Sequence, residues 1–208
     1  MMTRPPAKRW AKLLPRPERS IAHLLVLHCA PLLAGMKVSQ LLTTDRYAYC
    51  KIARLVCGTG IAVRPLLRTS NGITFLLYDP VSLKTHIGCD LHASFLQAHG
   101  YTDLSVEQVL AEVSRRYRLY QSGLRTFPHE LGILLGYPLH DVIGFMEHAG
   151  QNCLFCGYWK VYALPAQKKK LFQSFDLARE EFAKRLQNGA GIRDILAERA
   201  RRMYPKTA

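Results

Sequence analysis

Apolar side chains recur at three- and four-residue spacing along much of the chain, which is the pattern of helices that bury one face. Pro31 is expected to break or kink the first helix. Pro128 and Pro138 suit the first turns of two short helices, linked at Gly136-Tyr137. Longer helices are predicted over residues 18–30, 38–56, 81–87, 91–99, 105–120, 165–186 and 192–203.

Two runs rich in β-branched and aromatic residues, 61–67 and 73–78, flank Asn71-Gly72. Asn-Gly between such runs is a strong hairpin signal. A third alternating run, 158–164, is rich in Tyr, Trp and Val and is predicted to pair with the hairpin. The expected fold class is therefore α+β: a mostly helical single domain with a small antiparallel sheet, made of the hairpin at about 61–78 and a strand at about 158–164.

The formal net charge of +14 is concentrated at the two ends of the chain. Residues 1–20 carry six Lys or Arg against one acid, and residues 165–208 carry eleven against five, which leaves +3 for residues 21–164. We predict a basic, Pro-rich leader over 1–19, a single α+β domain over 20–175, and a basic helical extension over 176–208. Such ends are either solvated surface or contacts for a polyanion.

The first part of the chain imitates a secretory signal, because a basic stretch precedes an apolar one. His23 and His28 interrupt the apolar run, and no small-residue cleavage site follows it. No stretch reaches the length of a membrane span, so no membrane partner is expected. We therefore expect a cytoplasmic protein whose six cysteines are free thiols.

Four motifs concentrate reactive and conformationally special residues. They are His-Cys-Ala-Pro at 28–31, Pro-His-Glu-Leu-Gly at 128–132, Leu-Gly-Tyr-Pro-Leu at 135–139 and Gly-Tyr-Trp-Lys-Val-Tyr at 157–162. Together with Lys37 and Asp141-Val142, they resemble a bacterial family of uncharacterised proteins, a domain of unknown function. The resemblance covers about residues 20–175. It implies a shared fold and site, with no assigned activity.

Cys29 and His129 form the candidate pair of a thiol-based site. A thiolate is the nucleophilic form of cysteine, and an imidazole next to an acid can activate it, so Glu130 completes the predicted catalytic set. Neighbouring helix residues point about 100° apart, so His28 is not expected to act on Cys29 directly. The alternative is that Cys29 is a buried helix residue and that His129 and Glu130 cap a helix.

Cations and tyrosines in the same motifs predict a site for a small anionic molecule. Lys160 shares one face of the predicted strand with Tyr158 and Tyr162, and Lys37 is another isolated cation. The predicted ligand-binding residues are His28, Lys37, Tyr137, Tyr158 and Lys160.

Cys153 and Cys156 have the Cys-x-x-Cys spacing of a metal knuckle or a redox dithiol. A structural zinc site needs four ligands, and no second pair at ligand spacing accompanies them. The two cysteines are therefore only candidate metal ligands. The sequence leaves the cofactor and the oligomeric state unknown.

Residues 130–148 also have the spacing of a helix-turn-helix, but the second helix would present acidic side chains, which oppose phosphate contact. The preferred function is a cytoplasmic protein that binds a small anionic molecule or uses a thiol-based site. A nucleic-acid-binding protein that uses this segment and the basic ends is an alternative, and a structural or adaptor domain is a second one. Whether the protein is an enzyme stays open.

Overall fold

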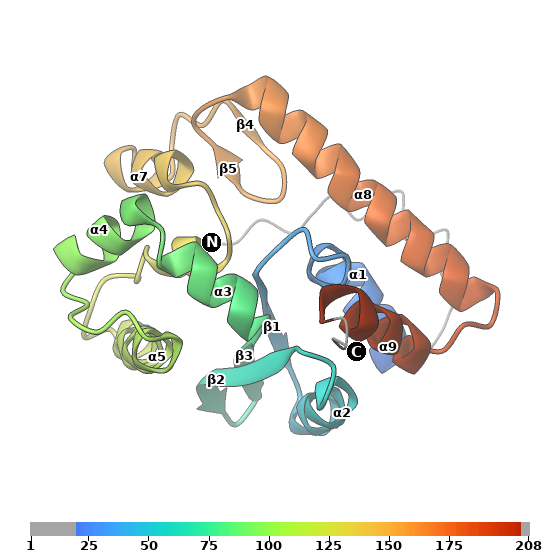
Figure 1. The fold of residues 1–208 in the computed structure, drawn as a ribbon. Helices are drawn as coiled ribbons and strands as arrows, with labels where there is room; N and C mark the ends of the chain where they lie inside the picture. The colour runs from blue at the N-terminus through green and yellow to red at the C-terminus, as the bar shows by residue number, and fades with distance from the viewer. Residues whose placement is uncertain (1–19, 205–208) are drawn as a thin grey trace. The chain divides into compact units, whose positions relative to one another are not determined.

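The computed structural model describes residues 20–204. The predicted leader, residues 1–19, and residues 205–208 of the predicted extension lie outside the described residues. The fold is α+β and mostly helical, as predicted (Figure 1). Within the described range the chain forms two compact units: unit 1 comprises residues 20–36 and 140–204, and unit 2 comprises residues 37–139.

Unit 2 is built on a three-stranded antiparallel sheet in the order β1-β3-β2. The predicted hairpin is confirmed, with β2 at Ala62–Thr69 and β3 at Gly72–Tyr78. β2 is an edge strand, and its pairing shifts at a bulge between Pro65 and Leu67. An edge position and a bulge are the settings in which a strand tolerates proline.

The third strand of this sheet corrects the prediction. One helix is expected over residues 38–56, but the structure has β1, Ser39–Thr44, and then α2, Arg46–Val56. The Asp45 carboxylate accepts a hydrogen bond from the Ala48 N–H at 2.8 Å and so starts the helix there. The short segment before Asp45 becomes a strand because all six of its residues pair with β3.

The predicted strand over residues 158–164 is also corrected. Only Lys160–Val161 is a strand, β5, and it pairs with β4, Phe155–Cys156, in a separate two-stranded ribbon. The predicted pairing with the hairpin is therefore wrong. The alternation of side chains in this segment is real, but the periodicity of a strand does not name its partner.

The remaining elements of unit 2 are helices: α3, Pro80–Ile87; α4, Asp90–Ala98; α5, Val106–Gln121; and the single turn α6, Leu131–Leu134. The first three confirm the helices predicted over 81–87, 91–99 and 105–120. α5 packs against β2, and α3 packs against the other three helices. The core of unit 2 includes Leu66, Leu76, Leu83, Ile87, Leu96, Tyr101, Val109, Leu110, Val113, Leu131 and Leu134.

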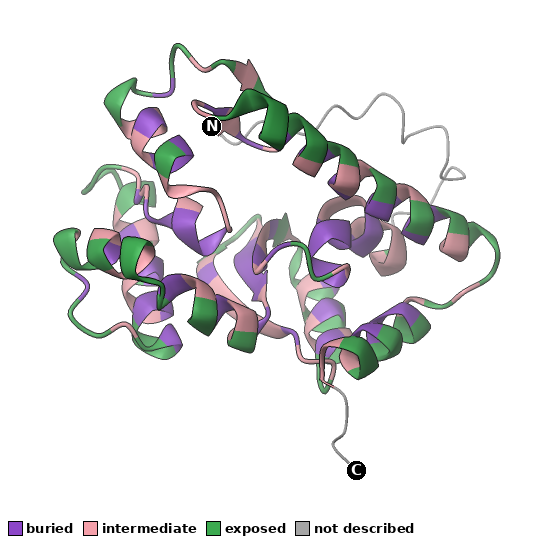
Figure 2. Ribbon diagram, turned by 45° about the horizontal axis from the view of Figure 1, so that its top comes forward, coloured by how far each residue is buried: buried purple, intermediate pink, exposed green. Residues whose placement is uncertain are grey.

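Unit 1 contains α1, Ile21–Leu33; α7, Leu139–Glu147; the β4-β5 ribbon; α8, Pro165–Gln187; and α9, Ile192–Met203. Both α8 and α9 pack against α1. Buried residues recur every three or four positions along α8, which gives it one packed face (Figure 2). α8 runs through residue 176 without interruption. The predicted boundary between domain and extension at that residue stays a prediction.

Pro31 lies inside α1, and the helix continues to Leu33, so the expected break does not occur. Proline has no N–H, and the carbonyl of Leu27, four residues earlier, therefore loses its donor within the helix. Arg179 of α8 replaces that donor: its Nε donates to the Leu27 carbonyl at 2.9 Å. A side chain from another helix thus satisfies the backbone group that proline leaves open.

The C-terminus of α1 is held in the same way by α9. Arg199 Nε donates to the Leu32 carbonyl at 3.4 Å, and Arg202 Nη2 donates to the Ala34 carbonyl at 2.9 Å. Carbonyl groups at a helix end carry partial negative charge, so cations there are stabilising. Part of the basic excess at the end of the chain therefore holds unit 1 together.

Candidate functional site

Glu130, a predicted catalytic acid, is buried and forms part of an ion-pair cluster in unit 2. It accepts hydrogen bonds from Arg116 Nη1 at 2.8 Å and from the Tyr101 hydroxyl at 3.0 Å. Arg116 also donates through Nε to Glu112 at 2.6 Å. Burial and the Glu130 carboxylate raise the pKa of Tyr101, so the phenol stays a donor. Through these contacts Glu130 connects the loop before α6 to α5 and to Tyr101.

His129 precedes Glu130 in the loop that leads into α6. The imidazole is half-buried and lies edge-on to Phe127, with 5.5 Å between the ring centroids. Burial lowers the pKa of His129, although the neighbouring Glu130 opposes this, so the ring is neutral at pH 7.

A single turn such as α6 is also too short for the first helix of a DNA-binding helix-turn-helix.

Lys37 and Tyr137, two predicted ligand-binding residues, come together in unit 2. The Lys37 ammonium lies 5.3 Å from the centroid of the Tyr137 ring and donates to Gln40 Oε1 at 3.2 Å. Burial raises the pKa of Tyr137 to about 12. Both side chains are therefore packed against neighbours rather than extended into solvent.

Cys29 and His28 lie in α1 of unit 1, where Cys29 is fully buried and His28 is half-buried. A buried thiol is in the setting of a structural cysteine rather than a reactive one. Cys29 belongs to unit 1 and His129 to unit 2, and their predicted pairing stays a prediction.

Tyr158 and Lys160 are also engaged within unit 1. The Tyr158 hydroxyl donates to Asp176 at 2.9 Å, and burial raises its pKa. The Lys160 ammonium donates to the Gly150 carbonyl and lies 5.9 Å from the Phe145 ring centroid. Both polar groups thereby tie separate segments of unit 1 together.

Asp141 is one of the residues that carry the family resemblance, but the sequence assigned it no role. Its buried carboxylate accepts hydrogen bonds from Trp159 Nε1 at 2.8 Å and from the backbone N–H groups of Tyr162 at 2.8 Å and Ala163 at 3.1 Å. One carboxylate of α7 therefore fixes the end of the motif at 157–162. Its function here is structural.

Cys153 is half-buried and Cys156 is exposed, and all six cysteines are free thiols. Burial and the charges of Cys153, Asp141 and Cys156 raise the pKa of Tyr162, whose buried hydroxyl has no hydrogen-bond partner within residues 20–204.

No group of three or more His, Cys, Asp or Glu residues in that range has the geometry of a metal site. Nor is any helix in it long and apolar enough to cross a bilayer.

A thiol and an imidazole do meet at a place that the motifs did not indicate. Cys89 is exposed at the N-cap of α4, and its Sγ lies 3.1 Å from Nδ1 of His92 in the first turn. The same nitrogen lies 2.7 Å from the carbonyl oxygen of His86. The His86 and His92 rings are 4.2 Å apart, and His86 Nε2 lies 3.0 Å from the Ile133 carbonyl. The sequence signal was a cysteine at a helix start with a histidine three residues later.

A comparison with protein families identifies the chain. A family model described as "Protein of unknown function (DUF3793)" matches residues 25–196. The chain belongs to this family. The resemblance to a domain of unknown function is thus confirmed, and the match extends beyond residue 175 into α9. No curated protein and no solved structure matches the chain.

In this member of the DUF3793 family, several of the motif residues form hydrogen bonds within their own unit. Glu130, Asp141 and Tyr158 each accept or donate hydrogen bonds that hold elements of their own unit in place. The cluster of His86, Cys89 and His92 differs, because its thiol is exposed and contacts an imidazole. It is therefore the candidate site with the clearest chemical capability.

Proposed function

We propose that this protein acts through a reactive thiol, Cys89, which His92 holds in position for nucleophilic attack. The observation that carries the proposal is the 3.1 Å distance between Cys89 Sγ and His92 Nδ1 at an exposed helix start. Thiol nucleophiles need access to a substrate and a neighbouring group that favours the thiolate. Cys89 combines both, whereas Cys29 is buried.

The contacts of His92 Nδ1 support the Cys89 sulfur as a hydrogen-bond acceptor, the role of a thiolate. A carbonyl oxygen only accepts hydrogen bonds, so the contact with the His86 carbonyl requires a hydrogen on His92 Nδ1. The Cys89 sulfur faces that same N–H and is therefore an acceptor, the role that a thiolate takes. The backbone N–H groups at the start of α4 add partial positive charge on the same side.

His86 supports His92 from the opposite side. Burial, reinforced by the charge of His92, lowers the pKa of His86, so its ring is neutral at pH 7. A neutral His86 packed 4.2 Å from the His92 ring restricts that ring without competing for a proton. The second histidine thus positions the first.

The chemistry that such a thiol supports is exchange with a low-molecular-weight disulfide. The Cys89 thiolate attacks one sulfur of the disulfide, a bond forms between the two sulfurs, and the original S–S bond breaks. The leaving thiolate takes up a proton from water, and the proton of the Cys89 thiol has passed to solvent. A second thiol reverses the reaction, so modification of Cys89 is a reversible response to disulfides.

The test measures how fast each cysteine of the full, reduced chain reacts with oxidised glutathione, with site-by-site readout by mass spectrometry. Cys57 is the matched control, because it is also exposed in unit 2 but caps the C-terminus of α2. We expect Cys89 to react about tenfold faster than Cys57. His92→Asn should bring the two rates together while leaving Cys57 unchanged.

Equal rates for Cys89 and Cys57 in the unaltered protein would contradict the proposal. So would a His92→Asn variant that folds normally and keeps the fast rate at Cys89. His99→Asn is the control for the loss of a histidine, since His99 ends the same helix and its Nδ1 contacts the Phe95 carbonyl.

A further inference from the structure

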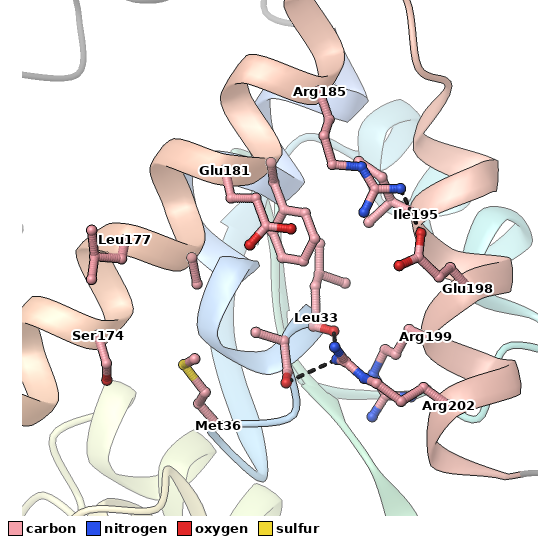
Figure 3. A pocket seen from close by; sticks show the side chains of 13 residues that line it. Leu33, Met36, Ser174, Leu177, Glu181, Arg185, Ile195, Glu198, Arg199 and Arg202 are labelled. Atoms are coloured by element: carbon pink, nitrogen blue, oxygen red, sulfur yellow. Dashed lines mark hydrogen bonds and ion pairs between the residues drawn. The ribbon is translucent and has the colours of Figure 1, made fainter.

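Unit 1 contains a cavity of about 240 Å³ between the end of α1 and facing sides of α8 and α9 (Figure 3). One wall is apolar and includes Leu33, Leu177, Phe182 and Ile195. Charged side chains of α8 and α9 border the rest. The volume lies below the roughly 300–1,000 Å³ of pockets for drug-sized ligands, so it suits a smaller molecule.

Arg202 is the cation best placed to take a ligand in this cavity. Its Nη2 donates to the carbonyls of Ala34 at 2.9 Å and Leu33 at 3.5 Å. Its Nε and Nη1 have no hydrogen-bond partner in the described part of the chain. A guanidinium has five N–H donors in a planar fork, so several of those on Arg202 remain for an anion.

The acidic side chains around the cavity restrict which anion fits. Glu198 forms an ion pair with Arg185 at 2.6 Å, which neutralises both charges. Glu181 also projects toward the cavity (Figure 3) and forms no ion pair within residues 20–204. A carboxylate that lines the same cavity as Arg202 repels a second negative charge on the ligand more than a first. A singly charged anion is therefore favoured over a phosphate monoester.

Leu177 indicates the rest of the ligand. This leucine of α8 lies at the cavity with 65% of its surface exposed. Phe182 and Ile195 also belong to the apolar wall, and both are buried. An apolar group that covers Leu177 would remove that surface from water, at about 25 cal/mol per Å².

We propose that this cavity binds a small monocarboxylate with an apolar body. The carboxylate accepts a hydrogen bond from one of the remaining donors of Arg202, Nε or Nη1, and the hydrocarbon part lies along Leu177 and Phe182. The charge of the guanidinium strengthens this hydrogen bond, and the apolar wall orients the rest of the ligand. The inference concerns unit 1 and does not depend on the reactivity of Cys89 in unit 2.

The test is titration of the full chain with octanoate, followed by NMR or calorimetry. Arg202→Gln should weaken octanoate binding at least about tenfold, because it removes the charge and the charged donor. Arg201→Gln is the matched control, since Arg201 is the exposed neighbour on α9 and does not line the cavity. Octanoate binding should be unchanged in that variant.

A second pair of variants keeps the test valid if Arg202→Gln disturbs the end of α1. Leu177 is exposed, so Leu177→Lys and Leu177→Glu should both fold. Leu177→Lys should retain or tighten octanoate binding and Leu177→Glu should weaken it several-fold. Hexylamine, a cation with a similar apolar body, should bind more weakly than octanoate to the unaltered protein.

Three results would overturn the proposal: no saturable binding of octanoate, tighter binding of hexylamine than of octanoate, or equal octanoate affinity in the two Leu177 variants. Preference for hexylamine would assign the cavity to organic cations held by Glu181. Tighter binding of inorganic phosphate than of octanoate would likewise contradict the singly charged ligand.

Discussion

The two units satisfy their buried charges in different ways. In unit 2, buried Arg116 is paired with the carboxylates of Glu130 and Glu112. In unit 1, the buried guanidinium groups of Arg179 and Arg199 donate to backbone carbonyls of α1. The first arrangement depends on the ionisation of acids, and the second depends on the path of a helix backbone. The units should therefore respond differently to the same perturbations.

The largest effect should follow when the ion pair of unit 2 loses its acid. Glu130→Gln keeps the shape of the side chain but leaves the buried Arg116 without its enclosed counter-charge. We expect a loss of about 3 kcal/mol in the free energy of unfolding of unit 2. Amide hydrogen exchange in α5 and α6 measures it within the full chain.

The matched control for that loss is Glu107→Gln, an exposed acid on α5, the helix that carries Arg116; it should change stability by less than about 0.5 kcal/mol. Replacing Arg116 and Glu130 together by leucine should recover most of the stability, because neither partner of the buried ion pair is then left unpaired. If Glu130→Gln is as mild as Glu107→Gln, unit 2 does not rely on this pair.

A smaller loss of stability should follow when unit 1 loses an arginine that donates a hydrogen bond to a backbone carbonyl. Arg179→Met keeps much of the packed stem but removes the donor to the Leu27 carbonyl, and we expect a loss of about 2 kcal/mol. Pro31→Ala returns an N–H to the helix at the position that serves the same carbonyl. Arg179→Met should therefore cost about 1 kcal/mol less when Pro31→Ala is present.

Hydrogen exchange of the α1 amides in the four members of this double-mutant cycle provides the measurement. Additive losses would show that the arginine does not replace the missing helix donor. In that case the loss on Arg179→Met would come from its contact with Asp176 at 3.1 Å and its position 5.1 Å from the Tyr158 ring.

The smallest expected effect is the pH dependence that Glu112 gives to the stability of unit 2. The hydrogen bond from Arg115, aided by Arg116, lowers the pKa of Glu112 from 4.5 to about 2. An acid whose pKa is depressed by folding contributes stability that is complete above the unfolded value and disappears as the pH falls to the folded value. Unit 2 should therefore lose on the order of 1 kcal/mol from this group between about pH 4.5 and pH 2, since Glu112 is partly exposed.

Glu112→Gln should flatten that part of the stability profile of α5, measured by hydrogen exchange or urea unfolding across the window. The contacts between arginines and carbonyls in α1 contain no group that titrates in this range. An equal change of slope in α1 on Glu112→Gln would contradict the separation of the two mechanisms.

Much of the local structure was predictable because its causes are local. Asn71-Gly72 specifies the hairpin, and Ser105 and Pro165 precede or start helices that the structure confirms. Each feature depends on conformational preferences of a few adjacent residues. By contrast, residues 39–44 become a strand through pairing with β3, whose partner residues lie 29 to 39 positions later in the sequence.

The candidate site was less predictable for the same reason. The motif around Pro128 indicated Glu130 as a catalytic acid. It did not indicate the ion pair with Arg116, which lies fourteen residues earlier on α5. Cys89 was not among the predicted residues, although His92 is only three positions away. The contact depends on the side-chain direction of His92, which the His86 carbonyl fixes. Sequence spacing alone does not show that hydrogen bond.

The sequence by itself determined the α+β class, most helix ends, the hairpin and the membership in a family of unknown function, because these depend on periodicity, capping and motif content. Only the tertiary structure decided which groups form hydrogen bonds with the buried polar atoms. The sequence predicted a break at Pro31, whereas α1 continues through it and the Leu27 carbonyl needs a donor from elsewhere. The fold assigned Arg179, since a buried acceptor takes the donor that packing brings within reach.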